Sequence, residues 1–192
     1  LPKLRDLEAI GAFGLTEPDH GSDISKGLAT TAERQGDHWI LNGEKKWIGN
    51  ATFCDVLVVW ARDVEDGQVK GFLVEKGTPG FQPQKMKHKM ALRVVQNADI
   101  QLKDCKVPES HRLSNANSFA DTARVLRMTR AGVAWQAVGC MAGAYDLALN
   151  YCKEREQFGK PIAGFQLVQD RLSQMLANLV SAQSLVVRLS QL

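Results

Sequence analysis

The sequence predicts an α+β multidomain protein in which an antiparallel β-barrel domain is followed by the first two long helices of a helical bundle. Two observations carry this prediction. From residue 11 to about residue 108, short apolar runs alternate with turn residues, which is typical of a compact barrel or sandwich. Beyond residue 120, apolar residues recur at helical spacing in two long stretches. We therefore expect a β domain over residues 1–115 and a partial helical bundle over residues 116–192.

Within the β domain, turn signals separate the strands. Trp39-Ile40-Leu41 runs into Asn42-Gly43, and this pair predicts a hairpin because both residues tolerate positive φ. The near-continuous apolar run from Val56 to Trp60 predicts a buried strand. Further strands are expected at 69–74 and 98–102, with turns at 66–67 and 78–81.

Apolar residues at helical spacing predict a long helix from about residue 121 to residue 153. Phe158-Gly159-Lys160-Pro161 breaks it, and a second helix with an apolar face is expected from residue 165 to residue 192. Two helices cannot bury both of their faces against each other. We therefore expect half of a bundle, completed by later helices or by other subunits.

Glycines interrupt the first of these helices at Gly132, Gly139 and Gly143. Each weakens a helix by about 1 kcal/mol relative to alanine. We expect close approach of a neighbouring helix to compensate for this cost.

Composition describes an ordinary chain of 192 residues, 44% hydrophobic and 23% charged, which is long enough for one large or two small cores. Its net charge of +3 comes from scattered basic residues, which argues against a nucleic-acid partner. No apolar run approaches the roughly 20 residues that span a bilayer, so no membrane partner is expected.

Leu1 is not an initiator methionine, and helical periodicity continues to the last residue. We expect the chain to be an internal piece of a longer protein.

The cysteines are far apart and lack zinc-ligand spacing, so no metal site is expected. They are Cys54, Cys105, Cys140 and Cys152. We interpret them as buried thiols in preference to disulfides. This interpretation indicates a reducing intracellular compartment without choosing among bacterial cytoplasm, mitochondrion and peroxisome.

Two segments carry the residues best suited to a cofactor: GLTEPDHGSD from Gly14 to Asp23, and KWIGN from Lys46 to Asn50. Thr16 offers a hydroxyl and a backbone N–H, in a turn held by Pro18, to the polar edge of a heterocycle. Trp47 offers an indole on which a flat ring could stack. The plainer interpretations are a Thr-Glu-Pro turn and a core tryptophan.

These segments resemble the acyl-CoA dehydrogenase and acyl-CoA oxidase flavoproteins, whose middle domain carries GLTEP-x-x-GSD and W-I-x-N around the flavin. The run from Arg155 to Pro161 resembles their R-x-x-F-G-x-P signature between two long helices. The resemblance covers essentially all 192 residues. It is nearest to the short-chain acyl-CoA oxidases, on the runs 47–50, 93–97 and 133–136, and next nearest to the glutaryl-CoA dehydrogenases.

The resemblance implies FAD as the cofactor and an acyl-CoA as the substrate, with a role in fatty acid β-oxidation. The residues that it assigns to the cofactor are Phe13, Leu15, Thr16, Gly21, Ser22, Trp47, Ile48, Gly49, Asn50, Arg155, Phe158 and Gln166. It assigns Ser22 and Arg130 to the acyl-CoA.

Family members use the counterparts of Arg155 and Phe158 to reach the flavin of an adjacent subunit, so a homo-oligomer, either tetramer or dimer, is implied. Two other interpretations stay open. Arg155 could be a surface arginine of an interhelical turn, and Arg130 could pair with Asp121 or Asp146.

The implied reaction is α,β-dehydrogenation of the thioester: a carboxylate removes the α-proton while the β-hydrogen leaves as hydride to the flavin. Most family members carry that carboxylate in a later helix. We therefore name no catalytic residue, and we expect this piece to be inactive alone. Gly49 stands where many dehydrogenases have threonine, which leaves room beside the flavin. Both oxygen and an electron-transfer flavoprotein are therefore kept as electron acceptors.

Two functions from other classes are kept beside this one. The first is a nucleic-acid-binding protein that retains the flavin fold. The second is a scaffold without catalysis.

Overall fold

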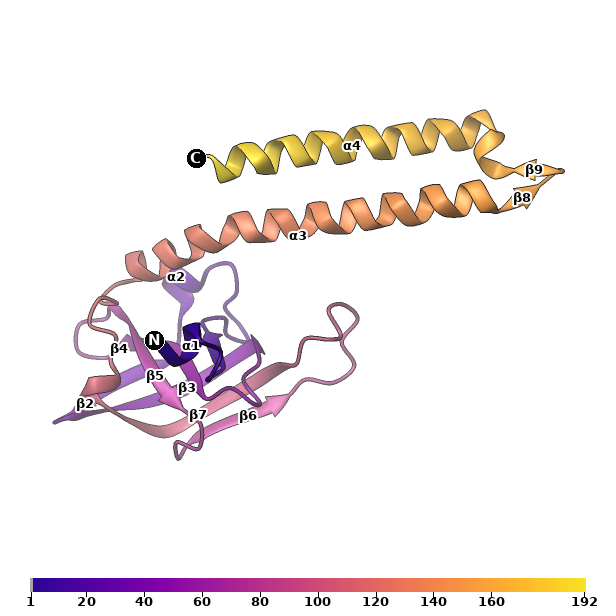
Figure 1. Cartoon of the computed structure of the whole chain (residues 1–192). Coiled ribbons are helices and arrows are strands. Elements are labelled where there is room, and N and C mark those ends of the chain that lie inside the picture. The colour runs from indigo at the N-terminus through magenta and orange to yellow at the C-terminus, as the bar shows by residue number, and fades with distance from the viewer. Residues whose placement is uncertain (1) are drawn as a thin grey trace. The chain divides into compact units, whose positions relative to one another are not determined.

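The computed structural model describes residues 2–192. Contacts divide the chain into two compact units, Leu1–Ala123 and Arg124–Leu192. The first contains the seven-stranded sheet, the second contains most of the helical residues and a two-stranded sheet, and Figure 1 shows both. The predicted two-part architecture, a β domain followed by two long helices, is confirmed.

The first unit is built on a seven-stranded mixed sheet in the order β1-β4-β2-β3-β7-β6, with β5 paired to β4. Its strands are β1 (Gly11–Gly14), β2 (Thr31–Gln35), β3 (His38–Gly49), β4 (Val56–Asp63), β5 (Val69–Glu75), β6 (Phe81–Lys85) and β7 (Asn97–Pro108). Most neighbouring strands pair in the antiparallel direction, as predicted. The structure adds two parallel pairings, because β1 and β2 both run parallel to β4.

The core of this unit lies against one face of β3 and both faces of β4. Trp39 and Leu41 alternate inward along β3, whereas Leu57, Val59 and Trp60 make β4 an almost continuously buried strand, as its apolar run predicted. Long β7 completes the core with its inward residues, which are Ala98, Ile100, Leu102, Cys105 and Val107.

The hairpin predicted at Asn42-Gly43 is wrong, because β3 runs through both residues. The chain turns earlier, at Gly36, whose φ is +65°. Gly43 instead lies at an irregularity in the pairing of β3 with β7, and its φ is +145°. A Cβ at Gly43 would lie 2.7 Å from the Cα of Thr30, so the glycine permits close approach of another segment.

The turn predicted at 78–81 is present: Phe81 N–H donates to the Thr78 carbonyl at 3.1 Å, and Gly80 has a φ of +85°. The short helical turns of this unit are α1 (Pro2–Arg5), α2 (Ile24–Gly27) and η1 (Glu109–His111).

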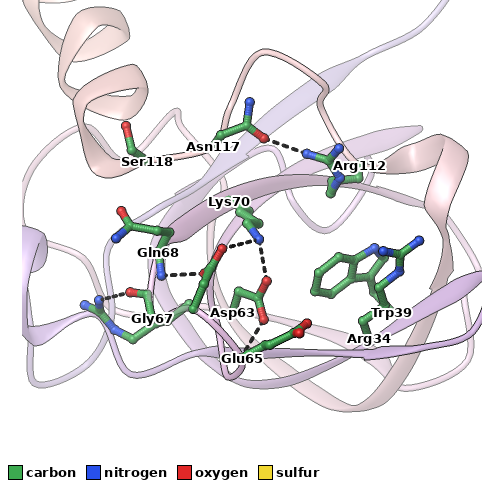
Figure 2. Close-up of polar contacts among 12 residues, drawn as sticks. Arg34, Trp39, Asp63, Glu65, Gly67, Gln68, Lys70, Arg112, Asn117 and Ser118 are labelled. Atoms are coloured by element: carbon green, nitrogen blue, oxygen red, sulfur yellow. Dashed lines mark hydrogen bonds and ion pairs between the residues drawn. The ribbon is translucent and has the colours of Figure 1, made fainter.

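A cluster of charged side chains lies between β4 and β5. Figure 2 shows the Lys70 ammonium bonded to the carboxylate of Asp63. Lys70 Nζ also lies 2.8 Å from Asp66 Oδ2. Asp63 is buried, and Lys70 also lies over the Trp39 ring at 5.5 Å. The cluster therefore pairs a buried carboxylate with a half-buried ammonium within the β domain.

The second unit pairs α3 (Phe119–Glu154), whose first turn lies before the unit boundary, with α4 (Gln166–Ser190). Figure 1 shows the two helices side by side, joined through β8 (Glu156–Gln157), β9 (Lys160–Pro161) and η2 (Ile162–Gly164). Val138, Leu179 and Val186 form their buried seam. Both helices agree with the prediction, and the seam is narrow because only one face of each helix is covered.

The helix glycines do not serve that seam. A Cβ added at Gly132, Gly139 or Gly143 would meet nothing within 4 Å among the described residues. Alanines supply the close approach instead, because Ala134, Ala142 and Ala182 pack against the seam.

All four cysteines are free thiols. Cys54 and Cys105 are buried as predicted, and burial raises the pKa of Cys105 to about 11. The prediction is wrong for Cys140, which is exposed on α3, and for Cys152, which is only half-buried. Between residues 2 and 192, no helix combines the length and the apolarity that a membrane crossing needs. In the same range, no group of three or more His, Cys, Asp or Glu side chains could hold a metal ion.

Candidate cofactor site

The two predicted cofactor segments lie against each other. After β1 ends at Gly14, the chain passes beside β3, where the backbone N–H of Lys46 donates to the carbonyl of Thr16 at 2.8 Å. Trp47 is the next residue along β3. Segments that are 30 residues apart in sequence therefore meet beside β3.

Trp47 lies in a β-bulge. Lys45 is opposite Ile100 and Ile48 is opposite Ala98, so β3 carries one residue more than β7 between these pairs. The φ of Trp47 is +64°, a conformation that is uncommon for a bulky residue. A bulge re-aims a side chain, and the indole is 54% exposed. This contradicts the plainer interpretation of Trp47 as a core residue.

Hydrogen bonds from β7 and the segment before it hold the bulge. Asn97 Nδ2 donates to the carbonyl of Trp47 at 2.7 Å. The ammonium of Lys89 bonds Asn97 Oδ1 and also donates to the carbonyl of Val95 at 2.6 Å. Because strained backbone persists only where its surroundings fix it, these contacts explain how Trp47 keeps its conformation.

A buried ion pair lies beneath the Thr16 segment. Lys45 Nζ is 2.8 Å from Glu17 Oε1, and the two side chains are 0% and 4% exposed. Burial alone would raise the pKa of Glu17, but the Lys45 charge and the hydrogen bonds that the carboxylate accepts lower it below its ordinary value. Burial lowers the pKa of Lys45 to about 8 despite the opposing effect of Glu17.

Gly21 and Ser22 lie at the exposed tip of the same loop. His20 closes the loop: its Nδ1 is 3.0 Å from Asp23 Oδ2, and a Cβ at Gly27 would lie 2.1 Å from that nitrogen. Nothing lies within 4 Å of a Cβ built on Gly21. The backbone at the tip is therefore open to a ligand.

Two hollows flank the loop. The larger, of about 610 Å³, is lined by Pro18 and Lys46 and by polar side chains of β6 and β7, including Gln82, Gln84 and Gln101. The smaller, of about 240 Å³, is lined by residues 17–20, 29–30 and 43–44. Pro18 and Glu44 line both hollows.

The remaining predicted residues of this unit differ in exposure. Phe13 is 38% exposed and meets the Trp60 ring edge-on at 6.1 Å. Leu15 and Ile48 are buried, at 6% and 4% exposure, and Ile48 belongs to the core of the β domain. After β3, Asn50 begins a turn with a φ of +65°.

The predicted residues of the second unit lie on exposed surface. Arg155 and Phe158 belong to the connection around β8 and β9, and Phe158 is 94% exposed with a φ of +53°. Gln166 is the first residue of α4. Arg130 lies on an exposed part of α3 and forms no ion pair within the part of the chain that the structure describes, whereas Asp121 accepts hydrogen bonds from Ser118 N and Oγ.

The sequence predictions do not include the residues that support this site. Lys45 had a usable signal, because it shares the inward parity of Trp39 and Leu41 along β3 and is therefore a lysine on the core face. Asn97 had none, because its contact is with a bulge 50 residues earlier in the chain, and Lys89 acts through Asn97.

Comparison with known proteins agrees with the family resemblance of the sequence motifs. The chain matches the family models described as the acyl-CoA dehydrogenase middle domain, at residues 12–105, and the acyl-CoA dehydrogenase C-terminal domain, at residues 119–192. It is 40% identical over 185 residues to subunit CarC of the caffeyl-CoA reductase-Etf complex of Acetobacterium woodii, covering 94% of this chain and 48% of CarC.

The chain is also 37% identical to glutaryl-CoA dehydrogenase of Desulfococcus multivorans, covering 98% of this chain and 49% of that one. A crystal structure of a glutaryl-CoA dehydrogenase from Mycobacterium smegmatis in complex with FADH2 matches it with a TM-score of 0.95 at 36% identity, covering 99% of this chain and 48% of that one. The chain spans about half the length of the relatives that it matches. It belongs to the acyl-CoA dehydrogenase family.

Proposed function

We propose that the protein containing this chain is an FAD-dependent enzyme that removes hydrogen from the α and β carbons of an acyl-CoA thioester. The observation that carries the proposal is the 2.8 Å hydrogen bond from Lys46 N–H to the Thr16 carbonyl. It sets a loop with unused donors beside a bulge that exposes an indole. The FADH2 bound to the glutaryl-CoA dehydrogenase of Mycobacterium smegmatis supports FAD as the cofactor.

The donors of this site suit a flavin, which has a polar edge and a large flat face. Among residues 2–192, the amide N–H and the hydroxyl of Thr16 have no hydrogen-bond partner, so both can serve the polar edge. The half-exposed indole of Trp47 can serve the face. Open backbone at Gly21 and the exposed Ser22 can approach a diphosphate or the arm of an acyl-CoA.

When bound, FAD would supply the hydride acceptor for the β-hydrogen. Thr16 would orient the polar edge of the flavin, and Trp47 would cover one face of the ring and keep water from it. Hydrogen bonds fix both residues beforehand, so little rearrangement is needed on binding. We assign no residue of this chain as the base. Thr129 of α3 is not the base either. A threonine hydroxyl is not a base at neutral pH, and this one donates to the Leu126 carbonyl at 3.0 Å.

We also propose that the protein is a homo-oligomer in which Arg155 and Phe158 serve the cofactor of a second copy. Their exposure on the connection between α3 and α4 supports this. The electron acceptor is proposed to be an electron-transfer flavoprotein or oxygen. The name of CarC, a subunit of a complex with Etf, supports the first, and the space left by Gly49 supports the second.

The test uses the full-length protein. We expect yellow flavin absorbance that bleaches anaerobically when a short-chain acyl-CoA is added. Replacing Trp47 with alanine should weaken FAD binding about tenfold, since aromatic stacking contributes about 0.5–1.5 kcal/mol beyond the burial of area. Val64→Ala is a control at another exposed apolar residue of the same unit (57%). A protein that takes up no FAD, or whose colour no acyl-CoA changes, contradicts the proposal.

A further inference from the structure

A buried ion pair, Lys45 with Glu17, lies next to the proposed cofactor residues, and the proposed function assigns it no role. Beneath the Thr16 segment, the side chain of Lys45 points into the core and is completely buried. Its ammonium donates to Glu17 Oε1 at 2.8 Å and to the carbonyl of Leu15 at 3.2 Å. A buried lysine thus holds the residues on both sides of Thr16.

The carboxylate of Glu17 binds a third segment of the chain. It accepts hydrogen bonds from Ala29 N at 2.6 Å, from Thr30 N at 2.9 Å and from the Thr30 hydroxyl at 2.5 Å. With Lys45, four donors converge on this one buried carboxylate. The pair therefore fastens the loop after β1, the segment before β2 and the strand β3 at one point.

Consecutive residues of β3 enclose Thr16. Lys45 holds the flanking Leu15 and Glu17 through its side chain, and Lys46 holds Thr16 itself through its backbone N–H. The next residue is Trp47. The register between the loop and the bulge is thus fixed by contacts that leave the Thr16 hydroxyl and the indole face free.

Stability alone does not explain this arrangement. The cost of desolvating a buried ion pair offsets much of its attraction, so well-packed apolar residues often serve a core equally well. A charged pair with four donors to one carboxylate is nevertheless specific in direction, because each hydrogen bond constrains the angle as well as the distance.

We infer that Glu17 and Lys45 are positioning residues of the cofactor site, which hold Thr16 in register with the bulge so that both contact one planar ring. The inference rests on the proposed function, because it concerns how the flavin is held. Neither side chain touches the ring. They act through Thr16 and through the strand that carries Trp47.

The β domain contains a matched control. Lys70 pairs with the buried carboxylate of Asp63 between β4 and β5, on strands that carry no predicted cofactor residue (Figure 2). Lys45 is fully buried and the Lys70 side chain is 14% exposed, and each ammonium contacts a buried carboxylate. Lys70→Met therefore reproduces the loss of such a pair without touching the Thr16 segment.

The experiment prepares full-length wild-type protein and the variants Glu17→Gln, Lys45→Met and Lys70→Met, each stripped of flavin. The measurements are the Kd for FAD, the visible absorption spectrum after reconstitution and the melting temperature of the flavin-free protein. We expect Glu17→Gln and Lys45→Met to raise the Kd at least about tenfold and to shift the flavin absorption bands. Lys70→Met should lower the melting temperature comparably, with a Kd within about twofold of wild type.

If the other site variants do not fold, Glu17→Asp tests whether Glu17 positions the cofactor residues. It keeps the charge but withdraws the carboxylate by one methylene, so it should fold and still bind FAD more weakly. If wild-type protein takes up no FAD, the proposed function falls and the inference falls with it. If wild type binds FAD and the folded site variants match its Kd and spectrum, the inference alone is overturned. Equal losses of FAD affinity in the site variants and in Lys70→Met also overturn it.

Discussion

The side-chain amide of Asn97 donates to the backbone carbonyl of Trp47 over 2.7 Å, which joins the first residue of β7 to the bulge of β3. Replacing Asn97 with alanine removes this bond and leaves the positive φ of Trp47 less constrained. A typical hydrogen bond contributes about 1 kcal/mol, so we expect FAD affinity to fall about fivefold. Titration of the flavin-free full-length variant with FAD measures this.

Gln96→Ala is the control for that substitution. The side chain of Gln96 contacts Thr52 Oγ1 at 3.3 Å and does not contact Trp47, while its backbone carbonyl, which accepts from Asn50 N–H, is unchanged. FAD affinity should therefore stay near that of wild type. Equal losses in the two variants would show that Asn97 has no particular role in holding the bulge.

Gly49 offers a test of the electron acceptor. A Cβ at this position would lie 3.6 Å from Val95 Cγ1, an ordinary contact, so a side chain can begin here without a clash at its first atom. If the space at Gly49 admits oxygen to the reduced flavin, Gly49→Thr should slow reoxidation in air-saturated buffer about tenfold, or about 1.4 kcal/mol in barrier. Stopped-flow absorbance measures the rate.

Gly49→Ala separates the methyl group from the hydroxyl in that experiment and should give an intermediate rate. Reoxidation rates that agree within about twofold in all three proteins would mean that Gly49 does not control access of oxygen. Dependence of turnover on an electron-transfer flavoprotein would then identify the acceptor.

Local periodicity accounts for what the sequence predicted well. The run from Val56 to Trp60 is buried on both faces, and the two long helices follow their spacing of apolar residues, because these signals need only neighbours along the chain. The turn at 78–81 depends on proline and glycine within four residues, and the structure contains it.

The features that could not be predicted depend on contacts between segments that are distant in the sequence. Asn42-Gly43 carries a hairpin signal, but the close approach of Thr30 requires Gly43 within a strand. The hydrogen bond that holds the Trp47 carbonyl comes from Asn97, 50 positions later in the chain. A motif could therefore indicate Thr16 and Trp47, but not the residues that hold them together.

The titration of Glu17 gives a prediction for acidic pH. Its pKa is lowered in the folded protein from an ordinary value of 4.5, because the effects of Lys45 and of the hydrogen bonds outweigh burial. A carboxyl of this kind stabilises the fold above its unfolded pKa, and that contribution is lost as the pH falls through the folded value. Glu17→Gln removes the titrating group, so its melting temperature should fall less than that of wild type between pH 7 and about pH 3.5.

Other carboxyls with lowered pKa values, including Asp37, Asp66 and Glu109, are shared by both proteins and cancel in this comparison. Calorimetry of the flavin-free proteins at the two pH values gives the difference directly. A larger drop in the variant than in wild type would contradict the lowered pKa of Glu17.

Gly43 links backbone geometry to the site. A methyl group there would lie 2.7 Å from Thr30 Cα, and the φ of +145° is already unfavourable for alanine. Gly43→Ala must therefore displace Thr30, which donates to Glu17, and we expect a cost of about 2 kcal/mol or more together with weaker FAD binding. Gly36→Ala, at a φ of +65° with open space around it, should cost only about 1 kcal/mol and leave FAD binding unchanged. Urea unfolding and FAD titration of both variants test this, and equal costs would mean that the contact with Thr30 is unimportant.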